Sequence, residues 1–429
     1  MTPNKEASPK KYLAIDVKSF YASAMAIMMG IDPLTCYLAV VGNTERDGSV
    51  VLAATPALKK DYGIKTGSRL YEIPKSKKIH IVNPKMKCFM EISTAIIELL
   101  YRFAPPDDVF VYSVDESFIK WRSPRLWGSP MDMAVNIKES ILREFGLTVT
   151  IGIGDNMLLA KLAMDIESKK SQSGIANWTL EDIPEKLWKV RPLSKMWGIG
   201  KRMERNLNRM GIATVGQLAN YPRELLQKRF GVIGLQLHDH ANGIDSSELN
   251  NAELNEIKSV GKSQILLRDY PGNSQKDIAD IKVVILEIAE IVASRARIHN
   301  KVGSTINLGI GYSVKEGGGG FSRSFTVERA TNMTMDIFKV CKKLFDENHQ
   351  LGKIVRSISI NLSNLMDDSG YTQLDFFESP VLLEKQSKIG KVMDEINLKF
   401  GKETISRAAS YTNAGTALHR STLIGGHMG

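Results

Sequence analysis

The sequence has few cysteines and no long hydrophobic run, and each absence excludes a class of protein. Its 429 residues include three widely spaced cysteines, Cys36, Cys88 and Cys341, without a CxxC or HxxxH pattern. This number and spacing suggest neither a disulfide framework nor a zinc site, and they indicate free thiols in a reducing compartment. No apolar run approaches the roughly 20 residues that cross a bilayer, and Met1 to Lys11 is polar. We therefore expect a soluble, cytoplasmic protein that contacts no membrane.

The chain also lacks low-complexity segments, so its composition is that of an ordinary globular protein. Hydrophobic residues make up 43% and charged residues 24%, which excludes disordered, collagen-like and mucin-like proteins. The length predicts about three domains. Lys and Arg exceed Asp and Glu by 10, and basic residues concentrate in 185–209 and 295–343. These two regions are candidate contacts for the phosphate backbone of a polyanion.

Strands and helices alternate through the first 180 residues, which is typical of an α/β domain. The hydrophobic pattern predicts strands at 12–17, 109–114 and 148–153, helices at 19–29, 90–102, 133–145 and 156–166, and a small lobe with two strand-like runs at 37–63. The small lobe therefore interrupts the α/β sheet.

The second half of the sequence predicts two further units. Short helices separated by glycine turns occupy 187–230, and the polar segment 246–256 is typical of a linker. Beyond it the predicted order is βαββαβ, a split βαβ unit. We expect everything after Asp367 to be an appendage, and 409–429 contains too few apolar residues to fold alone.

Three carboxylates stand at the ends of predicted strands. Asp16 closes the first strand, and Asp115 and Glu116 follow the strand at 109–114. If these strands are neighbours, the three groups converge, and clustered carboxylates repel one another unless a cation lies among them. Such oxygen ligands suit Mg²⁺ shared with substrate phosphates, and two ions can promote phosphoryl transfer. The pattern alone also allows three acids that only cap turns.

Several motifs occur in a fixed order around these acids. They are Ile15-Asp16-Val17-Lys18-Ser19-Phe20-Tyr21-Ala22-Ser23, Ser113-Val114-Asp115-Glu116-Ser117, Gly152-Ile153-Gly154 and Leu159-Ala160-Lys161-Leu162-Ala163. Together they resemble the palm and fingers motifs of the Y-family, translesion DNA polymerases, and the bacterial UmuC-like branch most closely. The resemblance extends from about Tyr12 to about Phe377.

The resemblance implies a multidomain α/β and α+β fold, a right-hand polymerase. Its parts would be a palm at 1–19 and 84–176, fingers at 20–83, a thumb with a helix-hairpin-helix at 177–245, a linker at 246–256, a βαββαβ little finger at 257–366 and a C-terminal tail at 367–429. The fingers are short, so little protein closes over the nascent base pair. Low-fidelity synthesis past damaged template bases is therefore implied.

The resemblance also implies the site residues. Asp16, Asp115 and Glu116, with the main-chain carbonyl of Val17, would bind two Mg²⁺ ions for nucleotidyl transfer. Residues implied to bind the incoming deoxynucleoside triphosphate are Phe20, Tyr21, Lys60 and Lys161.

Tyr21 and the two lysines have distinct implied roles. Tyr21 would lie beneath the sugar and exclude ribonucleotides, although the pattern alone allows a core aromatic. Lys60 and Lys161 would grip the triphosphate. Relatives often carry arginine at the position of Lys60, and a tyrosine where this chain has Ala57.

Two regions are candidate contacts for primer-template DNA. The segment Met196-Trp197-Gly198-Ile199-Gly200-Lys201 resembles a helix-hairpin-helix, whose glycines let backbone N–H groups approach a phosphate. Its candidate contacts are Gly198, Gly200, Lys201 and Arg202, and those of the little finger are Arg295, Arg297, Lys301, Arg323 and Arg329. A solvated charged face is the alternative for the second group.

Further partners follow from the tail. Gln373, Leu374, Asp375, Phe376 and Phe377 resemble the peptide by which bacterial polymerases dock on the sliding clamp. An accessory subunit of the damage response or a recombinase filament is a further candidate partner. Two other functions stay open: a nucleotidyl cyclase with a palm-like sheet, and a catalytically silent DNA-binding regulator. A cyclase has no use for the helix-hairpin-helix, and the intact acids argue against the regulator.

Overall fold

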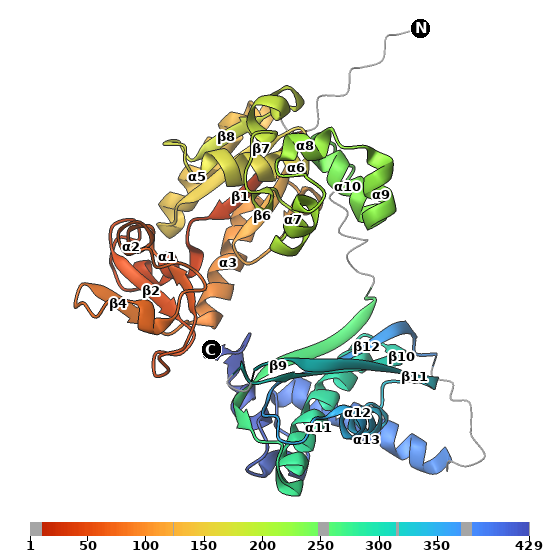
Figure 1. Cartoon of the computed structure of the whole chain (residues 1–429). Helices are drawn as coiled ribbons and strands as arrows, with labels where there is room; N and C mark the ends of the chain where they lie inside the picture. The colour runs from red at the N-terminus through yellow and green to blue at the C-terminus, as the bar shows by residue number, and fades with distance from the viewer. Residues whose placement is uncertain (1–10, 123, 248–256, 315–316, 370–379, 429) are drawn as a thin grey trace. The chain divides into compact units, whose positions relative to one another are not determined.

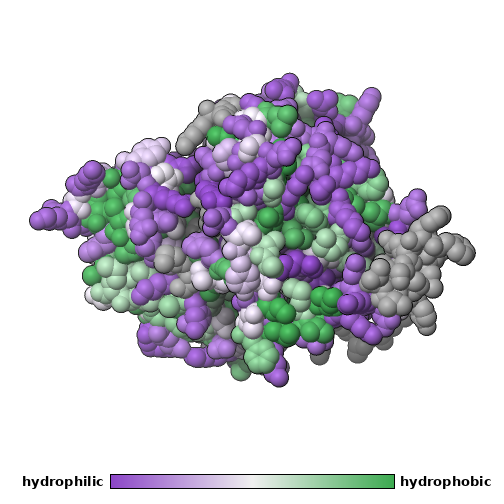
Figure 2. Space-filling model, turned by 90° about the horizontal axis from the view of Figure 1, so that it is seen from below, coloured by the Kyte–Doolittle hydropathy of each residue, from purple (hydrophilic) through white to green (hydrophobic). Residues whose placement is uncertain are grey.

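The structure is a computed structural model that describes residues 11–122, 124–247, 257–314, 317–369 and 380–428 (Figure 1). The chain forms two compact units, residues 1–251 with 427–429, and residues 252–426. Within the described ranges, no helix is both long and apolar enough to cross a membrane. Hydrophilic residues cover much of the face in Figure 2, with smaller hydrophobic groups between them.

A five-stranded sheet lies at the centre of the first unit. Its order is β5-β6-β1-β7-β8, with β1 antiparallel to both β6 and β7, and β8 parallel to β7. The strands are β1 (Lys11–Val17), β5 (Val109–Val111), β6 (Glu116–Trp121), β7 (Val149–Gly154) and β8 (Ile175–Trp178).

Alternate residues of β1 point to opposite faces of this sheet, and each face has its own helices. Leu13 and Ile15 pack in a core with residues of α3 (Met86–Leu100) and α5 (Pro130–Phe145). Ala14 packs instead with α6 (Met157–Leu162) and the π-helical turn Ala163–Ser168 that continues it. Asp16 lies two residues beyond Ala14, so its side chain points to the α6 face.

Two glycines of β7 let α6 approach the sheet closely. A Cβ atom on Gly152 would lie 2.0 Å from the carbonyl oxygen of Ala160 and 2.3 Å from the amide nitrogen of Met164. A Cβ atom on Gly154 would lie 2.3 Å from the amide nitrogen of Ala160. Both obstacles are backbone, so only glycine allows this contact. The Gly-Ile-Gly motif therefore sets the distance between the sheet and the helical residues near Asp16.

We expect Gly152→Ala to lower the free energy of unfolding by about 3 kcal/mol or more, because backbone cannot move aside as a flexible side chain can. Urea denaturation monitored by circular dichroism measures the change. Gly48→Ala is the matched control, since a Cβ atom there meets nothing within 4 Å, and it should change stability by less than about 0.5 kcal/mol. Equal stability of the two variants would contradict this role of Gly152.

The rest of the first unit consists of a small lobe and a helical part. The lobe contains a three-stranded sheet of order β3-β2-β4, in which the third strand was not predicted. Its elements are α1 (Phe20–Met28), β2 (Tyr37–Val41), β3 (Val51–Ala54), α2 (Pro56–Tyr62) and β4 (Ile79–Val82). The helical part consists of α7 (Lys201–Asn208), α8 (Val215–Ala219), α9 (Arg223–Phe230) and α10 (Val232–Ala241). A short helix, α4 (Pro124–Trp127), precedes α5.

The second unit contains the predicted βαββαβ order. Its strands form an antiparallel sheet of order β11-β10-β12-β9, and residues of α11 and α12 share its hydrophobic core. The elements are β9 (Ser259–Tyr270), α11 (Gln275–Ile298), β10 (Lys301–Tyr312), β11 (Gly320–Thr331), α12 (Thr334–Asn348) and β12 (Val355–Asp367).

The segment after β12 is folded to a greater extent than the sequence predicts. It contains α13 (Pro380–Phe400), α14 (Ala417–Ser421) and the short strands β13 (Leu423–Ile424) and β14 (His427–Met428). Glu287 of α11 is buried and accepts hydrogen bonds from the backbone N–H groups of Thr416 and Ala417. Long-range contacts of this kind hold a segment that is too polar to fold alone. The clamp-like peptide, Gln373 to Phe377, lies outside the described residues.

Candidate active site

Strand pairing brings two of the predicted acids together. Asp16 of β1 lies opposite Glu116 of β6 in the antiparallel register. The strand predicted at 109–114 ends earlier, at Val111, and the N–H groups of Tyr112 and Ser113 both donate to the carbonyl of Glu116 at 3.0 Å. The acidic pair therefore occupies a hairpin turn and the start of β6, instead of following the end of a strand. The predicted strand at 109–114 is not itself a neighbour of β1, because β6 lies between β5 and β1, and Glu116 reaches Asp16 as part of β6.

A third carboxylate joins them, and it is one that the sequence did not indicate. Carboxylate oxygens of Asp16, Glu116 and Asp165 lie within 4.8 Å of one another. Asp165 comes from the π-helical turn that follows α6. Asp115 is outside this group, and its carboxylate accepts a hydrogen bond from the Ser113 hydroxyl at 2.7 Å. Its main-chain carbonyl accepts from the N–H of Val17 at 2.9 Å, which ties the hairpin to β1.

Two lysines lie among these acids. The Nζ atom of Lys161 is 2.7 Å from Glu116 Oε1 and 3.0 Å from Asp165 Oδ2, and its side chain is only 6% exposed. The Nζ atom of Lys169 is 3.1 Å from Asp16 Oδ2 and 2.8 Å from Asp165 Oδ1. Lys161 was predicted as a site residue, whereas Lys169 was not. The arrangement alternates negative and positive groups, so each of these partly buried carboxylates faces an ammonium group.

Burial raises the pKa of Asp16 to about 7, with the Glu116 carboxylate acting in the same direction and Lys169 opposing it. Burial alone would lower the pKa of Lys169, but the carboxylates of Asp16 and Asp165 raise it overall. Asp16 and Glu116 fit Mg²⁺, because their hard carboxylate oxygens lie close enough to share an ion.

Tyr21 lies in the first turn of α1. Its ring stacks on that of Phe89 at 4.6 Å between centroids, and burial followed by the charge of Asp115 raises the pKa of its hydroxyl. The ring is only partly buried, so it keeps an accessible surface. The neighbouring Phe20 is 3% exposed and belongs to the hydrophobic core. Its side chain therefore supports the position of Tyr21 and presents almost no surface to a nucleotide.

On α2, the side chain near the acids belongs to Lys59. Its Nζ atom donates to the Ser19 hydroxyl at 2.7 Å, and burial lowers its pKa while Asp16 acts in the opposite direction. Lys59 and the adjacent Lys60 are both exposed. Successive helix residues point about 100° apart, because a turn takes 3.6 residues, so the two side chains leave α2 in different directions. Lys59 is a candidate that the sequence reasoning missed.

The predicted helix-hairpin-helix has an accessible helix start. Gly198 has φ 90°, and both Gly198 and Gly200 have open space around the position of a Cβ atom. Gly200 caps α7 without a side-chain hydrogen bond, and Lys201 and Arg202 in the first turn are exposed. The first turn of α7 therefore combines backbone donors with two cationic side chains.

The five basic residues predicted in the second unit lie in different environments. Arg323 is exposed, Arg329 is partly buried, Lys301 pairs with Asp367 at 2.7 Å, and Arg295 donates to the carbonyl of Gly261. Arg295 is also one of several cations near Lys262, whose pKa is lowered by burial first and then by the charges of Arg295, Arg420 and Lys402. This positive cluster was not apparent in the sequence, because its members come from distant segments.

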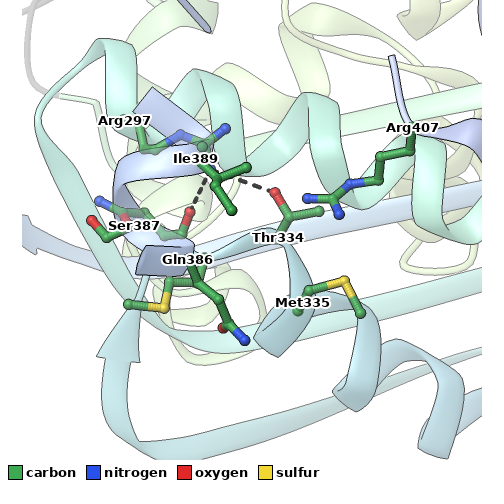
Figure 3. Close-up of a pocket in the computed structure, with 10 residues that line it drawn as sticks. Arg297, Thr334, Met335, Gln386, Ser387, Ile389 and Arg407 are labelled. Atoms are coloured by element: carbon green, nitrogen blue, oxygen red, sulfur yellow. Dashed lines mark hydrogen bonds between the residues drawn. The ribbon is translucent and has the colours of Figure 1, made fainter. Parts of the chain in front are cut away.

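Arg297 differs from the other four because its side chain is only 6% exposed. Its guanidinium donates to Asp394 of α13 at 2.6 Å and to the carbonyl of Asn332 at 2.9 Å. Figure 3 shows it beside a small pocket lined by Thr334 and by residues of α13 such as Ile389. The structure thus contradicts an exposed role for Arg297, which holds α13 in place.

Comparison with known proteins is consistent with this geometry. Residues 15–165 match the impB/mucB/samB family, residues 257–376 match the C-terminal domain of that family, and residues 194–245 match the thumb domain of DNA polymerase-iota. The chain is 60% identical to UvrX of Bacillus subtilis (strain 168), a protein whose name refers to UV-damage repair, over 97% of both chains.

Two further similarities extend over most of the chain. It is 37% identical to DNA polymerase IV 2 of the same organism, over 97% of this chain and 98% of that protein. Among solved structures, a Y-family DNA polymerase chimera matches with a TM-score of 0.64 and 20% identity, covering 83% of this chain and 99% of the other. The last likeness shows the fold: palm, fingers, thumb and little finger.

Proposed function

Because the chain belongs to the impB/mucB/samB family of Y-family DNA polymerases, in the UmuC-like branch, we propose that it extends primers opposite damaged template bases. The observation that carries the proposal is the register pairing of Asp16 with Glu116 beside the buried Lys161. Such a constellation holds cations and phosphates together, as nucleotidyl transfer requires.

We assign the parts of the site as follows. Asp16, Asp115, Glu116 and the carbonyl of Val17 would hold two Mg²⁺ ions, which polarise the attacking and leaving oxygens when bound. Lys161, with Lys59 or Lys60, would contact the triphosphate, and the exposed part of the Tyr21 ring would exclude a 2′ hydroxyl. The domain boundaries that we propose are 1–19 and 84–176 for the palm, 20–83 for the fingers, 177–245 for the thumb, 246–256 for the linker, 257–366 for the little finger and 367–429 for the tail.

Two surfaces support binding of primer-template DNA. The uncapped start of α7 offers backbone N–H groups and cations to a phosphate. The sheet of the second unit has a polar face opposite its helices, where Asn307 donates to the hydroxyls of Ser322 and Ser324 at 3.1 and 3.0 Å. Side chains of this kind are small and uncharged, which suits close approach to a duplex.

We also propose protein partners. They are a sliding clamp, bound by Gln373–Phe377, and a damage-response subunit or recombinase filament.

We expect Lys201→Ala/Arg202→Ala to reduce the dependence of DNA binding on salt. Each phosphate contact that is lost removes about 0.9 from the slope of log K against log salt, so the slope should fall by about 1 to 2. Fluorescence anisotropy with a labelled primer-template measures it between about 50 and 200 mM salt. The control is Lys189→Ala, since Lys189 is already paired with Glu185. A slope unchanged from that of the wild type would remove α7 from the DNA interface.

Two parallel incubations separate the proposed function from its alternatives. The protein is incubated with primer-template, Mg²⁺ and the four deoxynucleoside triphosphates, and separately with ATP or GTP alone. A polymerase lengthens the primer and releases pyrophosphate, whereas a cyclase forms a cyclic nucleotide without any primer. Binding of DNA without extension would support the silent regulator and contradict the proposal.

A further inference from the structure

Five side chains form one continuous chain of ion pairs across the candidate active site. In order, they are Glu116, Lys161, Asp165, Lys169 and Asp16, with successive N–O distances of 2.7, 3.0, 2.8 and 3.1 Å. Asp165 stands in the middle, and it uses one oxygen for each lysine. The two outer acids are those that pair in register across β1 and β6. Asp165 thus connects both lysines to each other, and through them to both outer acids.

Local structure explains why Asp165 can hold both lysines. Lys161 precedes it by four residues and Lys169 follows it by four, the spacing at which side chains on a helix meet. The close approach of α6 at Gly152 and Gly154 brings this helical row onto the face of the sheet that carries Asp16. Lys161 is nearly buried, so its position depends strongly on its partners.

We propose that Asp165 is a positioning residue, which retains Lys161 and Lys169 at the edge of the metal-binding carboxylates and keeps their ammonium groups directed at the triphosphate. The inference rests on the proposed function, because it takes Asp16 and Glu116 as metal ligands. It adds two residues, Asp165 and Lys169, to the assignments made for this site.

Electrostatic repulsion between the two lysines and a bound metal ion explains why Asp165 is needed to position them. The ammonium groups of Lys161 and Lys169 occupy cation positions beside Glu116 and Asp16, and a divalent ion at the same oxygens repels them. With Asp165 present, each lysine keeps one partner and moves only a short way. Without it, each lysine has only a metal-binding carboxylate to pair with. Both lysines then compete with the metal ion, and neither is held in position for the substrate.

The direct test is metal affinity in the full-length protein, without DNA or nucleotide. Mn²⁺ serves as the probe, and electron paramagnetic resonance counts the free ion. We expect Asp165→Asn to raise the dissociation constant of Mn²⁺ about tenfold, equivalent to 1.4 kcal/mol. Asp165→Glu restores the charge and should return the constant to within about threefold of wild type. Glu185→Gln, which removes an exposed ion pair of the same spacing, should change nothing.

A double variant separates positioning from direct ligation. If Asp165 acts by restraining the lysines, Asp165→Asn/Lys169→Ala removes one competitor and recovers most of the lost Mn²⁺ affinity. If Asp165 is itself a metal ligand, or only stabilises the fold, the double variant stays as weak as Asp165→Asn or weaker. That result, or Mn²⁺ binding by Asp165→Asn equal to wild type, overturns the proposal.

Kinetics give an independent readout at saturating metal. We expect Asp165→Asn to raise the KM for the incoming nucleotide about tenfold, with kcat within about threefold of wild type, since Lys161 and Lys169 act on substrate binding. A fall in kcat without a rise in KM in Asp165→Asn would contradict the positioning role of Asp165. Wild-type protein that extends no primer while the Mn²⁺ results hold refutes the polymerase proposal and leaves the lysine restraint intact. Wild-type extension with normal Mn²⁺ binding by Asp165→Asn refutes the positioning role only.

Discussion

Replacing Glu116 by glutamine should reduce primer extension at least about a hundredfold while leaving the affinity for primer-template nearly unchanged. The carboxylate lies opposite Asp16 and 2.7 Å from Lys161, at the point where the metal ions are proposed to bind. DNA affinity comes instead from cations and backbone donors elsewhere, such as the start of α7. Asp115→Asn should behave in the same way. The measurement pairs a quenched-flow extension rate with an anisotropy titration.

The matched control for this experiment is Glu139→Gln, which removes an exposed carboxylate on α5. Its extension rate should equal that of the wild type. If Glu116→Gln and Asp115→Asn both retain more than about a tenth of the wild-type rate, the two acids do not hold the catalytic metal ions. Loss of DNA binding together with activity would indicate that the variants are misfolded, and thermal melting detects that.

The second large effect concerns the choice between sugars. Tyr21→Ala should lower the preference for deoxynucleotides over ribonucleotides by roughly 10- to 200-fold, the range in which a steric pocket discriminates. The aromatic ring stacks on Phe89 and keeps a free surface, so removing it opens space where a 2′ hydroxyl can fit. Single-nucleotide insertion with dCTP and CTP opposite a template guanine measures the ratio.

Tyr21→Phe is the appropriate comparison, because it keeps the ring and removes only the hydroxyl. It should retain most of the discrimination. A Tyr21→Ala variant with an unchanged ratio and a lower melting temperature would show that the ring serves the core through Phe89 and has no role in sugar selection.

The position of the acids could be predicted from the sequence to a useful degree. Asp16 stands out because an apolar run marks its strand, and Asp115 and Glu116 stand out because they directly follow the β-branched and aromatic run at 109–114. The strand that carries Glu116, β6, was not predicted, and its pairing with β1 brings Glu116 opposite Asp16. Asp165 and Lys169 could not be predicted in the same way. They lie in and just after a π-helical turn, where the hydrophobic period of a regular helix does not apply, and their partners are up to 153 residues away.

The C-terminal segment shows a second limit of prediction from the sequence. Helix α13 was not predicted, and its position depends on Arg297, 97 residues earlier, pairing with Asp394. The same distant pairing explains why Arg297 was predicted as an exposed DNA contact, since the sequence does not show that α13 covers it. A charge that is buried by a distant segment has the same appearance in the sequence as a charge in solvent.

The central claim is that this site incorporates nucleotides opposite damaged bases. The most direct measurement is single-nucleotide insertion opposite an abasic site and opposite an undamaged base, with Mg²⁺ titrated into the metal-free protein. The account predicts insertion at both positions, dependent on Mg²⁺ and absent in Glu116→Gln. Insertion opposite the undamaged base alone, or insertion that persists without Mg²⁺ or in Glu116→Gln, would contradict it.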